Sequence, residues 1–126
     1  MRNCENKPEV RPTSFVLACA DGNDRLIDMH WTNWTPVGAS GTGVQYLNDC
    51  EPNCALGHFH RYPADIALTG SYKARPNEPF AYTKITLTYT AARPVVHIKV
   101  NGKVVATHPA TWSQELPLLH PAAAAD

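Results

Sequence analysis

Two of the four cysteines and two of the six histidines lie between Asn48 and His60, in the segment N-D-C-E-P-N-C-A-L-G-H-F-H. Free thiols are reactive, so we expect Cys50 and Cys54 to be joined in a disulfide or bound to a metal. The Pro52-Asn53 turn between them can bring their Cα atoms within the roughly 4.4–6.8 Å that a disulfide requires. We therefore favour a disulfide. It would stiffen the loop more than the fold, because a short closed loop removes little entropy from the unfolded chain.

The four cysteines allow three pairings. If Cys50 pairs with Cys54, then Cys4 pairs with Cys19 and ties the N-terminal arm to the first strand. The other two pairings join Cys19 to the 50–54 loop. An even number of cysteines favours an exported protein. Residues 1–7 are polar and contain no visible signal peptide, so the chain fits either a cytosolic protein or a mature secreted chain whose Met1 was added or retained.

A zinc site is the alternative for the same segment. Cys50, Cys54, His58 and His60 form a C-x3-C-x3-H-x-H pattern, which offers the four ligands that tetrahedral zinc prefers. His58 and His60 alternate along a strand, so both rings would point to one face. However, the H-x-H spacing is shorter than the spacing of structural zinc sites. We therefore expect no metal or other cofactor and keep the zinc-binding protein or hydrolase as an alternative.

Catalytic signatures are weak. The sequence contains no G-x-S-x-G, H-E-x-x-H or phosphate-binding loop motif. Asp28 and His30 could form a base and its orienting partner on one strand face, but no nucleophile accompanies them. We predict that the protein is not an enzyme.

Trp34 is the best candidate for a binding surface. It follows Trp31 in H-W-T-N-W-T-P, where we expect Trp31 to lie in the core. Exposed tryptophan offers a flat apolar anchor to sugars and peptides. The competing interpretation, in which Trp34 closes the end of the core, carries more weight.

Composition excludes several classes of partner. Eleven acidic and eleven basic residues cancel without any block of like charge, which argues against a nucleic-acid-binding face. No segment reaches the roughly 20 apolar residues of a membrane-spanning helix. A chain of 126 residues is expected to form one domain.

The hydrophobic pattern predicts an all-β fold of about seven short strands, with turns at the prolines and glycines. In 26–31, alternation places Leu26, Asp28 and His30 on one face. The dipeptide Asn101-Gly102 marks a hairpin between 95 and 108. We predict an antiparallel β-sandwich, immunoglobulin-like at most, with a small β-barrel as the alternative. The expected organisation is an N-terminal arm (1–12), a β-sandwich domain (13–110) and a C-terminal tail (111–126). The predicted strands cover 14–20, 26–31, 43–48, 64–72, 81–90, 95–100 and 103–107.

Several segments resemble small secreted proteins of actinobacteria, which are mostly uncharacterised and carry a cleaved signal peptide. The most specific part is W-x-x-W followed by N-D-C-E-P-N-C-A-x-G at 48–57, with C-A-D-G-N at 19–23 and Y-P-A-D-I-A-L at 62–68 as further matches. The resemblance implies export and a β-rich fold, without an activity. A cysteine of that pattern is missing near 73–76, and Cys4 would supply the partner for Cys19 instead.

Together these observations predict an exported, non-enzymatic structural or binding module of the cell envelope or extracellular space. Its partner is unknown. Candidate contacts are self-association or a protein partner at the edge of the 95–108 hairpin. A third hypothesis is a subunit of a larger assembly that docks through its proline-rich termini.

Overall fold

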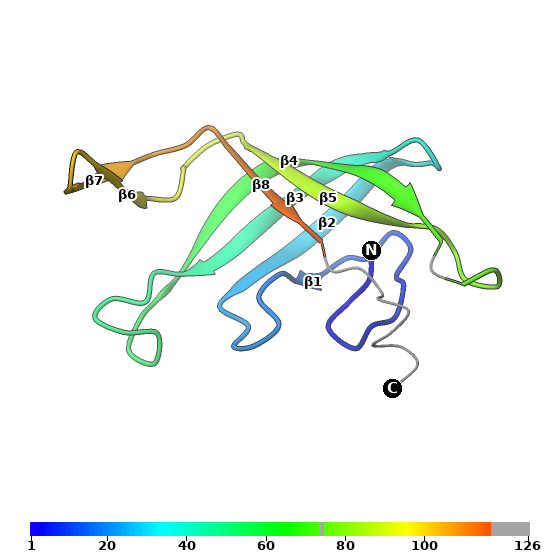
Figure 1. Ribbon diagram of the computed structural model, residues 1–126, viewed down its shortest axis with the longest axis horizontal. Helices are drawn as coiled ribbons and strands as arrows, with labels where there is room; N and C mark the ends of the chain where they lie inside the picture. The colour runs from blue at the N-terminus through cyan, green and yellow to red at the C-terminus, as the bar shows by residue number, and fades with distance from the viewer. Residues whose placement is uncertain (74, 117–126) are drawn as a thin grey trace.

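The computed structural model describes residues 1–73 and 75–116, which form eight β-strands and no helix. Six strands make one antiparallel sheet in the order β1-β2-β3-β4-β5-β8, and β6 and β7 form a separate hairpin (Figure 1). The predicted all-β antiparallel fold is confirmed. The strands are β1 (Phe15–Val16), β2 (Asp24–Trp34), β3 (Ala39–Asn48), β4 (Phe59–Tyr72), β5 (Ala81–Tyr89), β6 (Val96–Val100), β7 (Lys103–Thr107) and β8 (Thr111–Glu115).

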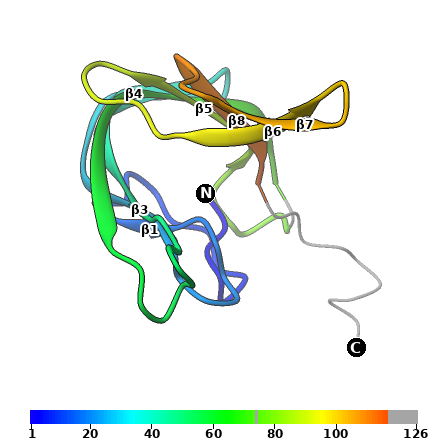
Figure 2. The same cartoon turned by 90° about the vertical axis from the view of Figure 1, so that its left-hand side faces the viewer.

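The large sheet curls into a half-barrel, and its concave side holds the core (Figure 2). The four central strands are long, so the right-handed twist between neighbours accumulates across the sheet. Alternating residues of β4 and β5 point inward, and the resulting set of buried side chains includes Ile66, Leu68, Ile85 and Leu87. This shape is consistent with both predicted architectures, the sandwich and the small barrel.

Two irregularities in β2 overturn the alternation predicted for 26–31. The pairing of β2 with β3 shifts between Ile27 and His30, and Asp28 adopts a positive φ of 53°. This bulge places both Leu26 and Met29 in the core, whereas alternation placed them on opposite faces. A second shift between Trp31 and Asn33 turns Trp34 inward.

The N-terminal arm is part of the core. Met1 and Arg2 are 0% and 2% exposed, and the chain terminus lies inside the concave side of the sheet (Figure 2). The Arg2 guanidinium forms a 2.8 Å ion pair with Glu78, which lies in the segment between β4 and β5. The Cys4–Cys19 disulfide closes the arm onto the segment after β1. The predicted boundary between arm and domain therefore does not separate two packing units.

The predicted C-terminal tail begins too early. Residues 111–115 form β8, which pairs with β5 and places Trp112 opposite Leu87. Residues 117–126 lie outside the described residues. Within the described part of the chain, no helix is long and apolar enough to cross a membrane.

The hairpin forms as predicted. Asn101 and Gly102 have φ values of 50° and 79°, the conformation of a type I′ turn. Its two strands do not join the large sheet, so the hairpin extends from one end of the molecule (Figure 1).

The disulfides give a prediction about stability. Cys4 and Cys19 are 15 residues apart, so replacing both by serine should lower the free energy of unfolding by about 3 kcal/mol through loop entropy. The matched Cys50→Ser/Cys54→Ser variant removes a disulfide that closes a much shorter loop, so it should lose about 2 kcal/mol. Urea unfolding of both variants measures the difference. A larger loss of unfolding free energy in the Cys50→Ser/Cys54→Ser variant would contradict the expectation that the Cys4–Cys19 disulfide contributes more to global stability.

Candidate functional site

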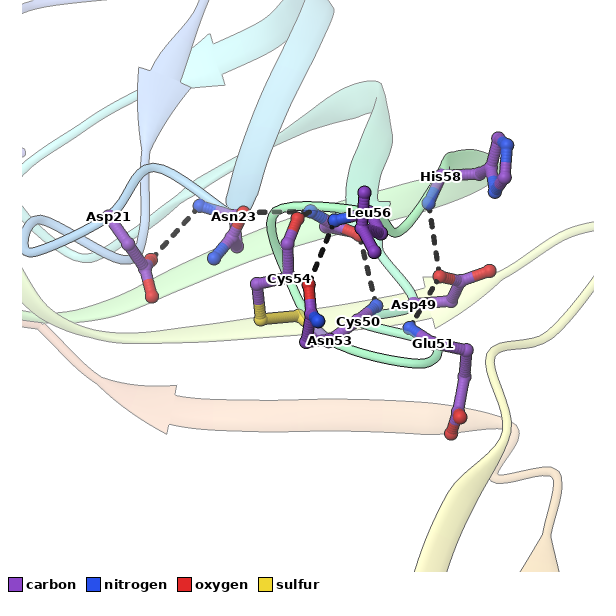
Figure 3. The surroundings of a disulfide bond; sticks show 10 residues. Asp21, Asn23, Asp49, Cys50, Glu51, Asn53, Cys54, Leu56 and His58 are labelled. Atoms are coloured by element: carbon purple, nitrogen blue, oxygen red, sulfur yellow. Dashed lines mark hydrogen bonds between the residues drawn. A yellow bond between two sulfur atoms is a disulfide. The ribbon is translucent and has the colours of Figure 1, made fainter.

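The loop between β3 and β4 is anchored by the side chain of Asn48. This side chain is buried: its amide donates to Asn23 (3.0 Å) and to the Cys54 carbonyl (2.8 Å), and its oxygen accepts from the Cys50 backbone (2.9 Å). A Cβ at Gly57 would lie 2.2 Å from the same Asn48 oxygen, so only glycine fits there. The Cys50–Cys54 disulfide then closes the loop (Figure 3).

Asp49 is the most fully bonded carboxylate of this loop. Its Oδ1 accepts hydrogen bonds of 3.0 Å from the backbone N–H groups of Glu51 and His58 (Figure 3), and its Oδ2 lies 2.8 Å from His60 Nε2. The hydrogen bond with His60, followed by those with the backbone, holds the pKa of Asp49 well below its usual range. The carboxylate is therefore ionised and acts only as an acceptor.

The contact with Asp49 orients the His60 ring. Since the ionised carboxylate only accepts, Nε2 of His60 carries a proton and donates it to Asp49. His60 and Tyr62 alternate along β4 and both face the concave side, with ring centroids 6.4 Å apart. The strand thus presents an oriented imidazole and a phenol side by side.

These groups line a cleft of about 430 Å³ at one rim of the half-barrel. Its walls come from the end of β3, the disulfide loop, the start of β4 and the start of the hairpin segment. No serine, threonine or cysteine is among its lining residues within the described chain. The lining residues are Leu47, Asn48, Asp49, Glu51, His60, Tyr62, Pro94, Val95 and His97.

A buried polar chain supports the cleft from inside the sheet. The Tyr89 hydroxyl donates to Gln45 (2.5 Å), and the Gln45 amide donates to Asp24 (3.0 Å). Burial raises the pKa of Tyr89 and of Asp24, and the hydrogen bond from Gln45 partly offsets the shift at Asp24. Tyr62 packs edge-on against Tyr89 at 6.2 Å, so the inner network contacts the cleft wall.

A second cleft, of about 400 Å³, lies between the N-terminal arm and β1–β2. Phe15 and Leu26 contribute apolar surface to it. Its arginine, Arg25, already donates to the Gly22 carbonyl and stacks over Phe59. This cleft therefore offers fewer unengaged polar groups than the one beside His60.

The structure contains the favoured Cys50–Cys54 disulfide and does not assemble the alternative set of zinc ligands. The sulfur atoms of Cys50 and Cys54 are bonded to each other, so neither is a thiolate. His60 faces Asp49, while the His58 ring points away from the disulfide (Figure 3). Among residues 1–73 and 75–116, no group of three or more histidine, cysteine or acidic side chains is placed to hold a metal ion. The zinc site is therefore wrong as a four-residue centre.

The structure also places the two other candidates, Trp34 and Asp28. Trp34 is only 8% exposed and packs edge-on against Trp31 and Tyr82, so it closes the core and offers no binding surface. Asp28 sits at the bulge and pairs with Arg61 at 3.0 Å instead of His30. The pattern-based proposal of an Asp28–His30 pair is wrong because the bulge changes the direction of the side chains.

Sequence reasoning overlooked Asp49, Gln45, Tyr62 and His97. One signal was available: Gln45 occupies an inward position of the alternating strand G-V-Q-Y-L-N, where a polar side chain needs buried partners. The partnership of Asp49 with His60 had no such signal, because it depends on the path of the loop.

The acidity of Asp49 predicts how stability depends on pH. The pKa of Asp49 is lower in the folded state than in the unfolded state, so the folded state binds fewer protons. The stabilisation is present above the unfolded value of about 3.8 and is lost as the pH falls below it. Asp49→Asn should flatten this acid limb, as measured by urea unfolding from pH 7 downward.

The matched Asp49→Ala variant tests the loop itself. Asparagine keeps an oxygen for the Glu51 and His58 N–H groups, whereas alanine leaves both without their acceptor. Alanine should therefore be the less stable of the two at neutral pH, as measured by urea unfolding. Equal stability would show that Asp49 does not organise the loop.

The chain matches no protein-family model, and comparison with curated proteins and with solved structures finds no match. The resemblance to secreted actinobacterial proteins therefore stays a prediction from the sequence.

Proposed function

We propose that this protein is an exported, non-enzymatic binding module that takes a small hydroxyl-bearing ligand, such as a sugar, in the cleft beside His60. Export is supported by the disulfides, which engage all four cysteines and suit an oxidising compartment. The observation that carries the binding role is the oriented His60–Asp49 pair, because it fixes the imidazole ring at the cleft before any ligand arrives.

The cleft suits hydroxyl donors. The Glu51 carboxylate accepts hydrogen bonds, and the Nδ1 atom of His60 and the imidazole of His97 add further polar groups. Tyr62 and Pro94 supply apolar surface of the kind that packs against a sugar ring. A few convergent polar groups within an apolar wall are typical of small-molecule sites.

Binding is favoured over catalysis by the composition of the cleft. An Asp–His pair activates a nucleophile when a hydroxyl or thiol lies within hydrogen-bond reach of the imidazole. No serine, threonine or cysteine is among the described lining residues, and the one hydroxyl-bearing lining residue, Tyr62, packs with its ring centroid 6.4 Å from that of His60. The Asp49–His60 pair therefore serves to orient the imidazole and to form hydrogen bonds with a ligand.

A titration with simple sugars tests this function. Glucose, galactose and N-acetylglucosamine are added at millimolar concentration to isotope-labelled protein, and amide and imidazole shifts are followed by NMR. At least one sugar should shift the signals of His60 and Tyr62. His60→Ala should weaken that binding by about tenfold, the loss expected for one charge-assisted hydrogen-bond network.

His58→Ala is the matched control, because His58 is an exposed histidine of the same loop that lies outside the cleft. It should leave the sugar affinity unchanged. Absence of binding by all three sugars would contradict the proposal. Preferential binding of tetramethylammonium would also contradict it, by showing that the acidic groups select a cation.

A further inference from the structure

The β6–β7 hairpin has one apolar face without a covering element. Register pairs Ile98 with Val105 and Val100 with Lys103, so Val96, Ile98, Val100 and Val105 share this face, with Thr107 at one end and Lys103 at the other. Ile98, Val100 and Val105 are 44%, 46% and 42% exposed. Figure 1 shows the hairpin at one end of the molecule, away from the concave core. Three exposed β-branched side chains on one small face are more than isolated surface residues.

The outer edge of β7 is also unpaired. The two-residue Asn101-Gly102 turn makes Val100 and Lys103 a hydrogen-bonded pair, so Val104 and Ala106 direct their backbone N–H and C=O groups outward. Among the described residues, β7 pairs with β6 alone. Val104 is 64% exposed. This edge combines free backbone groups with apolar side chains, which is the arrangement that accepts an added strand.

The positive charge of the hairpin limits which partner can bind the β7 edge. No aspartate or glutamate lies between Glu78 and Glu115, whereas the hairpin carries Lys99 and Lys103. Both lysines flank the turn, and no acidic residue is bound to either in the described structure. The complementary partner therefore carries carboxylates.

A second copy fits poorly. Two hairpins that met symmetrically would place lysine against lysine. The hairpin face also covers only roughly 160 Å², from five residues at about 3.3 Å on two strands about 4.8 Å apart. A stable interface needs roughly 800 Å² on each partner.

A lipid surface fits less well than a peptide. The hydrocarbon region would leave the outward backbone groups of Val104 and Ala106 without partners, and an open sheet edge is not tolerated there. A third strand satisfies those groups directly.

We propose that the β7 edge binds an extended segment of another protein, in which β-branched residues alternate with acidic residues. The β-branched side chains extend the Ile98–Val105 face, the carboxylates meet Lys99 across the opposite face, and backbone hydrogen bonds form with Val104 and Ala106. The proposed surface is the outer edge of β7, whereas the His60 cleft reaches His97 on the other strand of the hairpin, and the proposal does not depend on the function of that cleft.

The test uses the full chain and the probe peptide acetyl-Thr-Glu-Val-Glu-Val-Glu-Val-Thr-amide. NMR titration should shift the Val104 and Ala106 amides. The same peptide with lysine in place of glutamate should bind about tenfold more weakly. Lys99→Glu/Lys103→Glu should reverse this preference between the two peptides.

Edge variants locate the added strand. Ala106→Pro removes an outward N–H without breaking the β6–β7 ladder, and should weaken binding of the acidic peptide by about tenfold. Ala106→Ser is the matched control, because it keeps the outward N–H at the same position of β7. It should leave peptide affinity unchanged.

Three results would overturn the proposal. One is absence of peptide binding at millimolar concentration while the amide spectrum shows an intact hairpin. Another is binding to phosphatidylserine–phosphatidylcholine vesicles that Lys99→Glu/Lys103→Glu abolishes, without any peptide binding. The third is a concentration-dependent dimer that is lost in Ala106→Pro. Sugar binding at His60 is measured separately, so either proposal can fail without the other.

Discussion

A single curled sheet has one apolar concave face, and that face must be covered for the protein to fold. No second sheet packs over it in the described structure; the N-terminal arm does so, with Met1 and Arg2 buried against the strands. The buried Arg2 guanidinium is tolerated because Glu78 and Asn6 satisfy its donors. The Cys4–Cys19 disulfide keeps the arm close to the sheet when local contacts open. The other features of the sheet depend on how much of its concave face the N-terminal arm covers.

At the opposite rim, polar side chains replace apolar ones on the concave face. Gln45 links Tyr89 to Asp24, and the disulfide loop then brings Asp49 onto His60. The hydrogen bonds to Tyr89 and Asp24 hold the Gln45 side chain in one arrangement, because rotating its amide would leave a buried polar atom without a partner. The cleft is therefore preorganised by the same strands that build the core. Loop closure by Cys50 and Cys54 adds rigidity where a site needs it and contributes less to global stability.

The β6–β7 hairpin, unlike the cleft, is not built on the strands of the core. In the described structure it pairs with no strand of the large sheet, and it contributes none of its strand residues to the core cluster. A two-stranded sheet is only marginally stable in isolation, so an added third strand would stabilise it as well as bind. The protein thus combines a rigid polar cleft with an apolar, basic extension. The two surfaces suit ligands of different chemistry.

The sequence by itself determined the features that depend on neighbours along the chain. Period-two alternation predicted β4 and β5, and Asn101-Gly102 predicted the hairpin, because both signals are local. The bulge at Asp28 escaped prediction, since a one-residue shift leaves no mark on composition yet reverses every side chain that follows. β8 was assigned to the tail because its partner, β5, lies far away in sequence. The turn between Cys50 and Cys54 favoured the two disulfides that the structure contains, because that signal is also local. Tertiary structure alone brought Asp49 to His60, because their distance is set only by the folded backbone.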